Sequence, residues 1–223
     1  MKIRRLLVAA ACAVMLGTEA GAQAGSPDAS AIITRAARTY RALSALQADF
    51  RQRIDDEFLG AMSARGVLSQ AGDNRFAMRF TDPANDAIII DGTRVWVYLP
   101  SSMPGQVLRY PMPSGPVYGY NLLALFLDRP LERYRVSFVK TEEVDGRRAD
   151  ALLLEPVATD LPFRRATVWF DREDFLPRRL EILEKTGAKR TVELSRLRPN
   201  ASIAPSVFTF VPPRGVKVVD QKS

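Results

Sequence analysis

The stretch IIIDGTRVWVYLP, residues 88–100, decides the fold. Three isoleucines precede Asp91-Gly92, and valines then alternate with aromatic residues. Asp-Gly between two β-rich runs is the strongest short-range signal for a hairpin, because both residues tolerate the positive φ angles of a two-residue turn. The stretch VSFVKTEEVDGRRADALLLEP, residues 136–156, repeats this arrangement around Asp145-Gly146. Two such hairpins predict an antiparallel sheet in which sequence neighbours pair.

Many further segments alternate apolar and polar residues, which is typical of half-buried strands. Weaker turn signals lie at Gly72-Asp73-Asn74 and Thr186-Gly187. Strands and helices do not alternate along the chain, so a parallel sheet is not expected. We predict a mostly β fold with helices, built on a single curled antiparallel sheet of about 10–11 strands, an unclosed β-barrel. The further strand segments are residues 46–54, 62–68, 76–80, 134–139, 151–154, 166–170, 179–183 and 191–194.

Two segments break the β pattern and predict helices. In DASAIITRAARTYRALSAL, residues 28–46, apolar residues recur every three to four positions, and Asp28 or Ser30 can cap the helix. In NLLALFLDRP, residues 121–130, the leucines are too dense for strand alternation. There Asn121 can cap a short helix that stops before Pro130. Both helices are expected to cover the apolar face of the sheet as a filling or a lid.

The N-terminus carries the features of a cleaved secretory signal peptide over residues 1–22. Basic residues from Lys2 to Arg5 precede an apolar run that ends at Gly17, followed by Ala20-Gly21-Ala22. The run continues past Cys12, and lipoprotein-type cleavage there would bisect it, so we favour ordinary secretion. Residues 23–223 are then a single exported domain.

The residue inventory excludes several classes of enzyme. The chain has no histidine, and its one cysteine lies in the predicted leader. Histidine-based acid–base catalysis, thiol nucleophiles and the usual zinc sites are therefore excluded. No glycine-rich phosphate loop occurs. We expect a monomer that is not an enzyme, uses no cofactor and binds no nucleic acid. The formal net charge of +7 favours acidic or lipid partners.

The predicted strands place methionine and phenylalanine side chains on one face of the sheet. Phe50, Met62, Phe76, Met78 and Phe80 share this inward parity. Such residues are more often plain core than ligand lining. Their adaptable shapes suit variable apolar ligands, however, and export without catalytic groups favours an apolar binding protein.

Other aromatic and basic residues leave two interpretations open. Trp96, Tyr98 and Trp169 fit either the lining of a cavity or a position under the first helix. The arginine pairs are expected on solvated faces or hairpin ends, where they would meet acidic partner loops if they act at all. These pairs are Arg147-Arg148, Arg164-Arg165 and Arg178-Arg179.

Taken in order, five segments resemble the periplasmic lipoprotein carrier family, LolA. The resemblance runs from the first helix to the C-terminus, and its most specific pieces are the 88–100 hairpin and the closing segment. In that family the terminal segment packs back onto the sheet, which implies that Phe208 and Phe210 are core anchors. The segments are LQADFRQRI (46–54), GVLSQAGDNRFAMRFTDP (66–83), IIIDGTRVWVYLP (88–100), NLLALFL (121–127) and FTFVPPRGVKVVDQ (208–221).

The resemblance implies a periplasmic chaperone without enzymatic activity. Such a carrier accepts acylated lipoproteins from an inner-membrane ABC-type exporter and delivers them to an outer-membrane acceptor. Its hydrophobic cavity would bind the acyl chains beneath a helical lid, with Phe76 at the mouth. The expected lining comprises Phe50, Met62, Leu68, Phe76, Met78, Phe80, Leu123, Phe126, Phe138 and Phe170.

One departure separates this chain from the family pattern. Where the family has Arg-Pro at the turn before the third strand, with the arginine tethering the lid, this chain has Gly72-Asp73. Arg75 stands two residues too late to take that place. An alternative function on the same scaffold is a lipid- or lipoprotein-sensing regulatory domain, since fold alone does not decide function.

Overall fold

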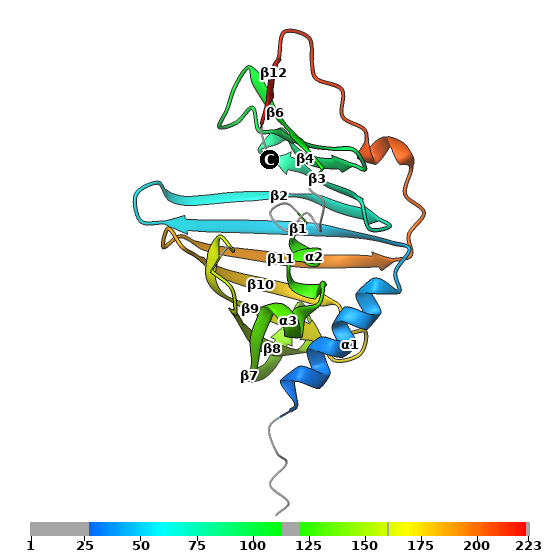
Figure 1. Cartoon of the computed structure of the whole chain (residues 1–223), viewed down its shortest axis with the longest axis vertical. Helices are drawn as coiled ribbons and strands as arrows, with labels where there is room; N and C mark the ends of the chain where they lie inside the picture. Colours follow the sequence, from blue (N-terminus) through cyan, green and yellow to red (C-terminus); the bar gives the residue numbers. More distant parts are fainter. Residues whose placement is uncertain (1–26, 113–120, 160, 222–223) are drawn as a thin grey trace, which may run out of the picture.

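Twelve strands form one sheet that does not close into a barrel (Figure 1). The computed structural model describes residues 27–112, 121–159 and 161–221, so the predicted signal peptide lies outside the described residues. The sheet order is β12-β6-β5-β4-β3-β2-β1-β11-β10-β9-β8-β7. All neighbours pair antiparallel except β12 and β6, which are parallel. The strands are β1 Ala45–Asp56, β2 Gly60–Ala71, β3 Arg75–Asp82, β4 Ala84–Asp91, β5 Arg94–Tyr98, β6 Gln106–Pro111, β7 Tyr134–Val144, β8 Arg147–Pro156, β9 Phe163–Asp171, β10 Pro177–Glu184, β11 Lys189–Pro199 and β12 Lys217–Asp220.

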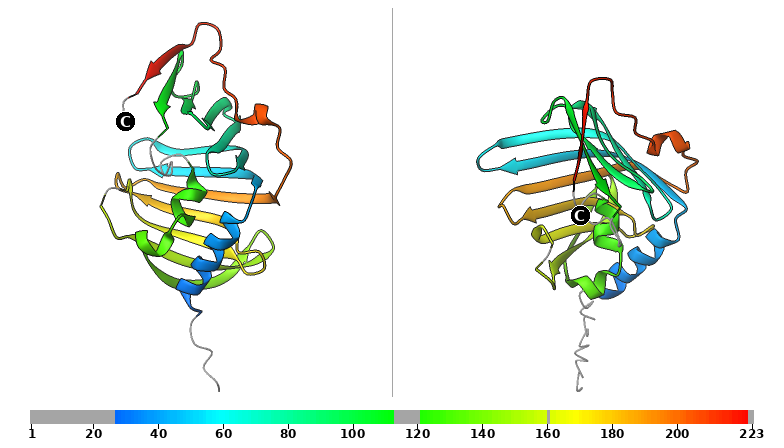
Figure 2. Two further views of the ribbon diagram at one scale, coloured as in Figure 1. Left: turned by 45° about the vertical axis from the view of Figure 1, so that its right-hand side comes forward. Right: turned by 45° about the horizontal axis from the view of Figure 1, so that its top comes forward.

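Three helices lie together on one side of the sheet (Figure 2). They are α1 Ala29–Arg41, α2 Leu122–Leu127 and α3 Pro130–Arg133, and α1 contacts both of the others and β7. Asp28 caps α1, since its Oδ1 accepts hydrogen bonds from the N–H groups of Ser30 and Ala31 at 2.9 and 3.2 Å. Both predicted helices are therefore confirmed.

Both predicted hairpins form, but only the second has a two-residue turn, since four residues separate the paired Ile90 and Val95 of the first. Gly92 has φ +98°, and Asp91 Oδ1 accepts hydrogen bonds from two N–H groups just beyond it, those of Thr93 and Arg94, at 2.8 Å each. At the second hairpin Asp145 and Gly146 both have positive φ, as a tight turn of this kind requires.

Apolar side chains are buried on both faces of the sheet. The inner face is the one covered by α1, α2 and α3, and it carries the main cluster of buried side chains. The outer face is the opposite one, where Ala77, Ala87, Ile89 and Phe208 form a smaller cluster. This division follows strand parity, because neighbouring side chains on a strand point to opposite faces. Parity thus assigns residues to a face along a regular stretch of strand, and a bulge such as the one between Phe138 and Lys140 on β7 reverses the assignment beyond it.

The C-terminal segment crosses the outer face before it joins the sheet. After β11 a 3₁₀ helix, η1 Pro205–Phe208, buries Phe208, which is 2% exposed. Arg79 of β3 holds this segment through hydrogen bonds to the carbonyl oxygens of Val207 and Thr209, at 3.1 and 2.8 Å. In Figure 1 the segment then runs to β12, beside β6. The prediction that the tail packs onto the sheet is correct for Phe208, whereas Phe210 is half-buried.

Strands β6 and β12 and helix α3 were not predicted. Strand β6 has only six residues and ends in Pro111, so its alternation is short. Strand β12 raises the total to twelve and makes the sheet partly parallel. Helix α3 begins at Pro130, which was expected only to end the preceding helix. Proline also suits the first position of a new helix, because its missing N–H would be unpaired there anyway.

Candidate functional site

The inner face brings together nine of the ten predicted lining residues in one apolar cluster. Strands β1, β2, β3, β7 and β9 supply seven of them, and α2 supplies the other two. Phe80 meets Phe50 edge to face, with ring centroids 5.1 Å apart. The buried members are Phe50, Leu68, Phe76, Met78, Leu123, Phe126 and Phe170, and the partly buried ones are Phe80 and Phe138.

Helix α2 fills the space that the curled sheet encloses. Leu123 and Phe126 are each 1% exposed, although the helix has only six residues. The ring of Phe126 lies 5.5 Å from that of Phe163 on β9 and 6.1 Å from that of Tyr134 on β7. Helix α2 thus occupies the apolar interior with its own side chains.

A buried polar link ties α1 and α2 to the sheet. Gln70 Oε1, on the inner face of β2, accepts hydrogen bonds from the Tyr40 hydroxyl at 2.6 Å and from Asn121 Nδ2 at 3.2 Å. The side-chain oxygen of Asn121 also caps α2 by accepting from the N–H groups of Leu123 and Ala124. One amide therefore joins both helices to β2. We name Tyr40, Gln70 and Asn121 the amide link.

The amide link is neutral at physiological pH. Burial raises the pKa of Tyr40 to about 12, against the opposing effect of its hydrogen bonds with Gln70 and Asn121. No charge has to be buried to hold the helices in place. This differs from the arginine tether of the family pattern, which Gly72-Asp73 had put in doubt.

A cavity of about 280 Å³ opens at one end of the inner face. Met62, which is 42% exposed, stands at this opening next to Met78 and Phe80. We call this cavity the mouth. Its other apolar lining residues are Ile54, Ala64, Pro83, Ile88, Leu99 and Leu122, and its polar ones are Gln52, Ser63, Asp86, Ser101, Ser102 and Arg190.

Phe76 does not stand at the mouth, so that prediction is wrong. It is 1% exposed and lies opposite Gln70 in the β2–β3 register, beside the amide link. The reason is strand direction: Phe76 is near the start of β3, whereas the mouth adjoins Phe80 near its end.

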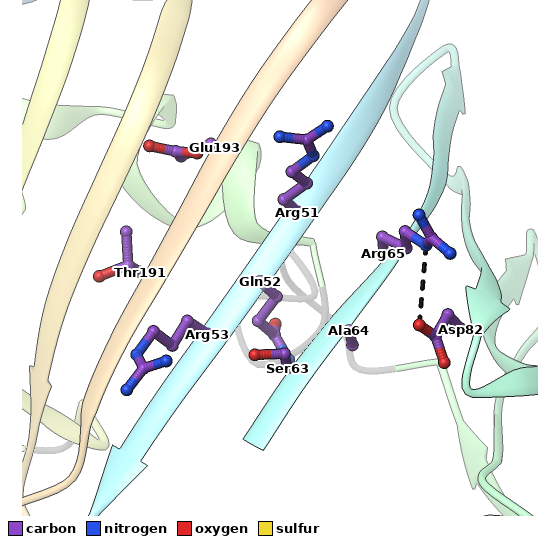
Figure 3. Close-up of a pocket in the computed structure, with 9 residues that line it drawn as sticks. All are labelled: Arg51, Gln52, Arg53, Ser63, Ala64, Arg65, Asp82, Thr191 and Glu193. Atoms are coloured by element: carbon purple, nitrogen blue, oxygen red, sulfur yellow. Dashed lines mark ion pairs between the residues drawn. The ribbon is translucent and has the colours of Figure 1, made fainter. Parts of the chain in front are cut away.

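A larger recess of about 530 Å³ lies on the outer face and is polar (Figure 3). Arg51, Arg53 and Arg65 line it, and Arg65 forms an ion pair with Asp82 at 3.7 Å. Its charged walls do not suit acyl chains, because a charge against hydrocarbon loses its hydration. The mouth also contains Asp86 and Arg190, but most of its lining is apolar and continuous with the inner-face cluster. It is therefore the better site for apolar ligands, although it is smaller.

The two tryptophans and Tyr98 fit neither interpretation that the sequence left open. The ring of Phe210 lies 5.5 Å from Trp96 and 5.4 Å from Tyr98, within the outer-face packing of the C-terminal segment. Trp169 clusters with Val144, Ala149 and Ala151 and donates a hydrogen bond to Glu142. On β5, Trp96 and Tyr98 alternate with the inward-facing Val95 and Val97, and on β9 Trp169 precedes the inward-facing Phe170, so all three point to the outer face.

The arginine pairs are less uniform than predicted. Arg178 is 5% exposed and forms ion pairs with Asp171 and Asp174. Of the two expected positions it therefore takes a hairpin end, at the start of β10, and not a solvated face. Arg147 also pairs with the Asp171 carboxylate. Although burial raises the pKa of Asp171, hydrogen bonds from Arg147 and two backbone N–H groups lower it to about 2. These contacts hold the β8–β9–β10 turns together.

Sequence reasoning missed Gln70 as a site residue. A signal was present, since Gln70 shares the inward parity of Leu68 on β2 yet is polar. A buried amide requires partners, but their identity depends on how α1 and α2 cross the sheet, which parity does not give.

Within residues 27–112, 121–159 and 161–221, no helix has the length and apolarity needed to cross a membrane. In the same ranges no three His, Cys, Asp or Glu side chains are grouped as a metal site requires.

Comparison with known proteins identifies relatives over most of the chain. An outer-membrane lipoprotein carrier protein of Xanthomonas axonopodis pv. citri is 28% identical over 184 residues, 80% of this chain and 83% of the relative. One of Shewanella loihica, with the same description, is 26% identical over 215 residues, 95% of this chain and 93% of the relative.

Solved structures show the same fold at low sequence identity. An uncharacterized conserved protein from Thermus thermophilus matches with a TM-score of 0.56 at 14% identity, over 86% of this chain and 99% of that one. The Pseudomonas aeruginosa MucA/MucB complex matches with a TM-score of 0.50 at 15% identity, over 86% of this chain and 63% of that one. The profile of the family described as outer membrane lipoprotein carrier protein LolA matches residues 41–211. The chain belongs to the LolA family.

Proposed function

We propose that this protein is a periplasmic carrier whose inner face binds the acyl chains of lipoproteins. The observation that carries the proposal is the apolar inner-face cluster, which short helices cover and which opens at the mouth. The carrier names of the relatives support the cargo class. The proposed lining is the set of ten residues expected from the sequence, with Met62 at the mouth and Phe76 in the interior.

The size of the cargo requires the inner face to open. A triacylated lipoprotein has on the order of 45 methylenes, each stabilised by about 0.8 kcal/mol when removed from water. If each methylene takes up ~30 Å³, the volume of one water molecule in the liquid, the acyl chains need roughly 1,300 Å³. The mouth offers about 280 Å³, and a second cavity beside the amide link, lined by Tyr40, Gln70 and Leu127 among others, offers about 400 Å³, so the two together are still too small. The present arrangement is therefore a closed state, and the acyl chains take the place of α2.

This exchange explains how a carrier could bind acyl chains tightly and still release them. Leu123 and Phe126 already cover the interior in the closed state. When cargo binds, the contacts of the acyl chains with the inner face replace those of α2. When cargo leaves, α2 covers the inner face again, and this offsets much of the free energy lost as the acyl chains depart. The amide link sets the remaining difference between the two states.

The partners follow from the same role. We propose that an inner-membrane ABC-type exporter loads the carrier and that an outer-membrane acceptor unloads it. The carrier acts as a monomer without catalysis and leaves nucleotide hydrolysis to the exporter. The regulatory alternative differs in one respect: a lipid sensor retains its ligand and signals, whereas a carrier passes it on.

A pair of neighbouring substitutions tests the proposed site. Met62→Glu places a carboxylate at the mouth, where it repels acyl chains or loses hydration, so affinity for a fluorescent triacylated peptide should fall at least about tenfold. Ala61→Glu is the control, since Ala61 is exposed on the outer face opposite Asp55 and does not line the mouth. It should change affinity by less than about threefold, because the exposed charges interact weakly.

Two results would contradict this account. Equal losses in both variants would mean that the mouth is not the binding site. Retention of the bound peptide in the presence of excess lipid vesicles would favour the regulatory alternative over a carrier.

A further inference from the structure

The tip of the β1–β2 hairpin carries two adjacent apolar side chains that the fold leaves in water. Phe58 is 90% exposed and Leu59 is 74% exposed, and no other pair of neighbouring large apolar residues is so exposed in the described part of the chain. Neither residue belongs to the apolar clusters of the sheet. Isolated exposed apolar residues are common, but a pair at the apex of a turn needs an explanation.

The turn holds both side chains outward. Asp56 Oδ1 accepts hydrogen bonds from the N–H groups of Phe58 and Leu59 at 2.8 and 2.9 Å. Gly60, with φ +78°, completes the turn into β2. The tip is therefore a shaped turn and not a loose loop.

The hairpin also projects beyond its neighbours. Pairing with β3 ends at Arg65, so residues 60–64 of β2 have no partner strand on that side. On the other side, β1 pairs with β11 as far as Asp55, one residue before β1 ends, so only the turn itself extends beyond β11. Figure 1 and the right view of Figure 2 show this tip extending past the adjacent turns. Phe58 and Leu59 thus form the apex of a protruding spike.

The tip is continuous with the mouth. Met62 and Ile54 lie opposite each other on the two strands of the hairpin, between the tip and the cavity that both line. An apolar path therefore runs from Leu59 through Met62 to Phe80. Acyl chains on this path would stay beside apolar side chains between a membrane and the interior.

We propose that Phe58 and Leu59 insert into the surface of a lipid bilayer and place the mouth against it. A protruding spike buries its side chains only in something that it penetrates, and the boundary between headgroups and acyl chains accepts such groups. The role in cargo delivery rests on the proposed carrier function, whereas insertion itself does not.

The charges around the tip specify the kind of lipid. Asp55, Asp56 and Glu57 precede Phe58, whereas Arg53 is paired with Asp55 and the exposed Lys189 lies opposite Asp55 on β11, so three acidic groups face two basic ones. An acidic approach to the tip disfavours anionic headgroups. We therefore assign the tip to a zwitterionic lipid surface, with insertion driven by apolar burial.

Vesicle co-sedimentation of the purified mature protein tests the proposal. Phosphatidylcholine vesicles should bind the wild-type protein, and Phe58→Ser with Leu59→Ser should weaken binding by about tenfold per side chain. Val211→Ser is the matched control, because Val211 is 77% exposed on the C-terminal segment, away from the hairpin. It should bind like the wild type, and adding phosphatidylglycerol or salt should not strengthen binding.

Several outcomes would overturn the assignment. These are an absence of wild-type binding, equal binding by the double variant, or binding that requires phosphatidylglycerol. A double variant that binds vesicles normally but loses transfer only with a protein acceptor would assign the tip to a protein pocket. Acyl-peptide binding without vesicles is measured separately and should be unchanged in the double variant. Its absence in the wild-type protein would refute the carrier function and leave the vesicle result intact.

Discussion

Removing the Gln70 side-chain amide should release both helices from the sheet. In Gln70→Leu the Tyr40 hydroxyl and the Asn121 amide both lose their acceptor in a buried position. An unsatisfied buried donor costs about 1–3 kcal/mol, so the variant should lose about 2–4 kcal/mol of unfolding free energy. Tyr40→Phe removes one hydrogen bond and leaves no unpaired donor, and should cost only about 1 kcal/mol.

Urea unfolding of the two single variants and the double variant measures the coupling directly. If Gln70 is the partner of Tyr40, Tyr40→Phe in the Gln70→Leu background should cost nothing or even stabilise, because it then removes an unpaired hydroxyl. Additive losses would refute the reasoning.

The same substitution should also alter cargo binding. If the closed state must open to accept acyl chains, destabilising it by about 2 kcal/mol raises the fraction competent to bind by up to roughly 30-fold. Gln70→Leu should therefore bind a triacylated peptide more tightly than the wild-type protein does. Weaker binding by a folded variant would show that the amide link shapes the site and does not hold it closed.

Three further perturbations test the fold. Gly66→Ala should cost several kcal/mol or prevent folding, because its Cβ would lie 2.1 Å from the Arg79 carbonyl oxygen; normal thermal stability would contradict this close approach. Arg79→Ala should cost about 1–3 kcal/mol and expose the C-terminal segment to proteolysis, since two carbonyl oxygens lose their donor. The pKa of Asp171 is about 2 in the folded protein and 3.8 in the unfolded chain, so its ionised carboxylate stabilises the fold above about pH 4. Roughly 2 kcal/mol of the free energy of unfolding should be lost as the pH falls from about 4 to 2. Asp171→Asn should not show this loss.

Strand parity and turn chemistry made most of the fold predictable. The Asp-Gly turns fixed two hairpins, and alternation then placed Phe50, Leu68 and Met78 on one face. Parity works because a strand offers only two directions for a side chain. Elements that depend on distant partners were harder: β12 is a strand only because β6 lies beside it.

The sequence predicted which residues make up the candidate site but not how far each of them lies from the mouth. Parity assigned Phe76 to the correct face, yet its distance from the mouth depends on where β3 begins relative to the opening. The amide link was out of reach for a similar reason, because Gln70, Tyr40 and Asn121 are brought together only by the helices that cross the sheet. The Gly72-Asp73 pair, which stands where the family has Arg-Pro, did show that the family's arginine tether of the lid helix could not be carried over to this chain.

The most direct test of the central claim is native mass spectrometry of the mature protein with a triacylated lipopeptide. We predict a one-to-one complex with the acylated peptide and no complex with the same peptide lacking its acyl chains, since only the chains can replace α2 on the inner face. Equal binding of both peptides, or binding of neither, would contradict the account.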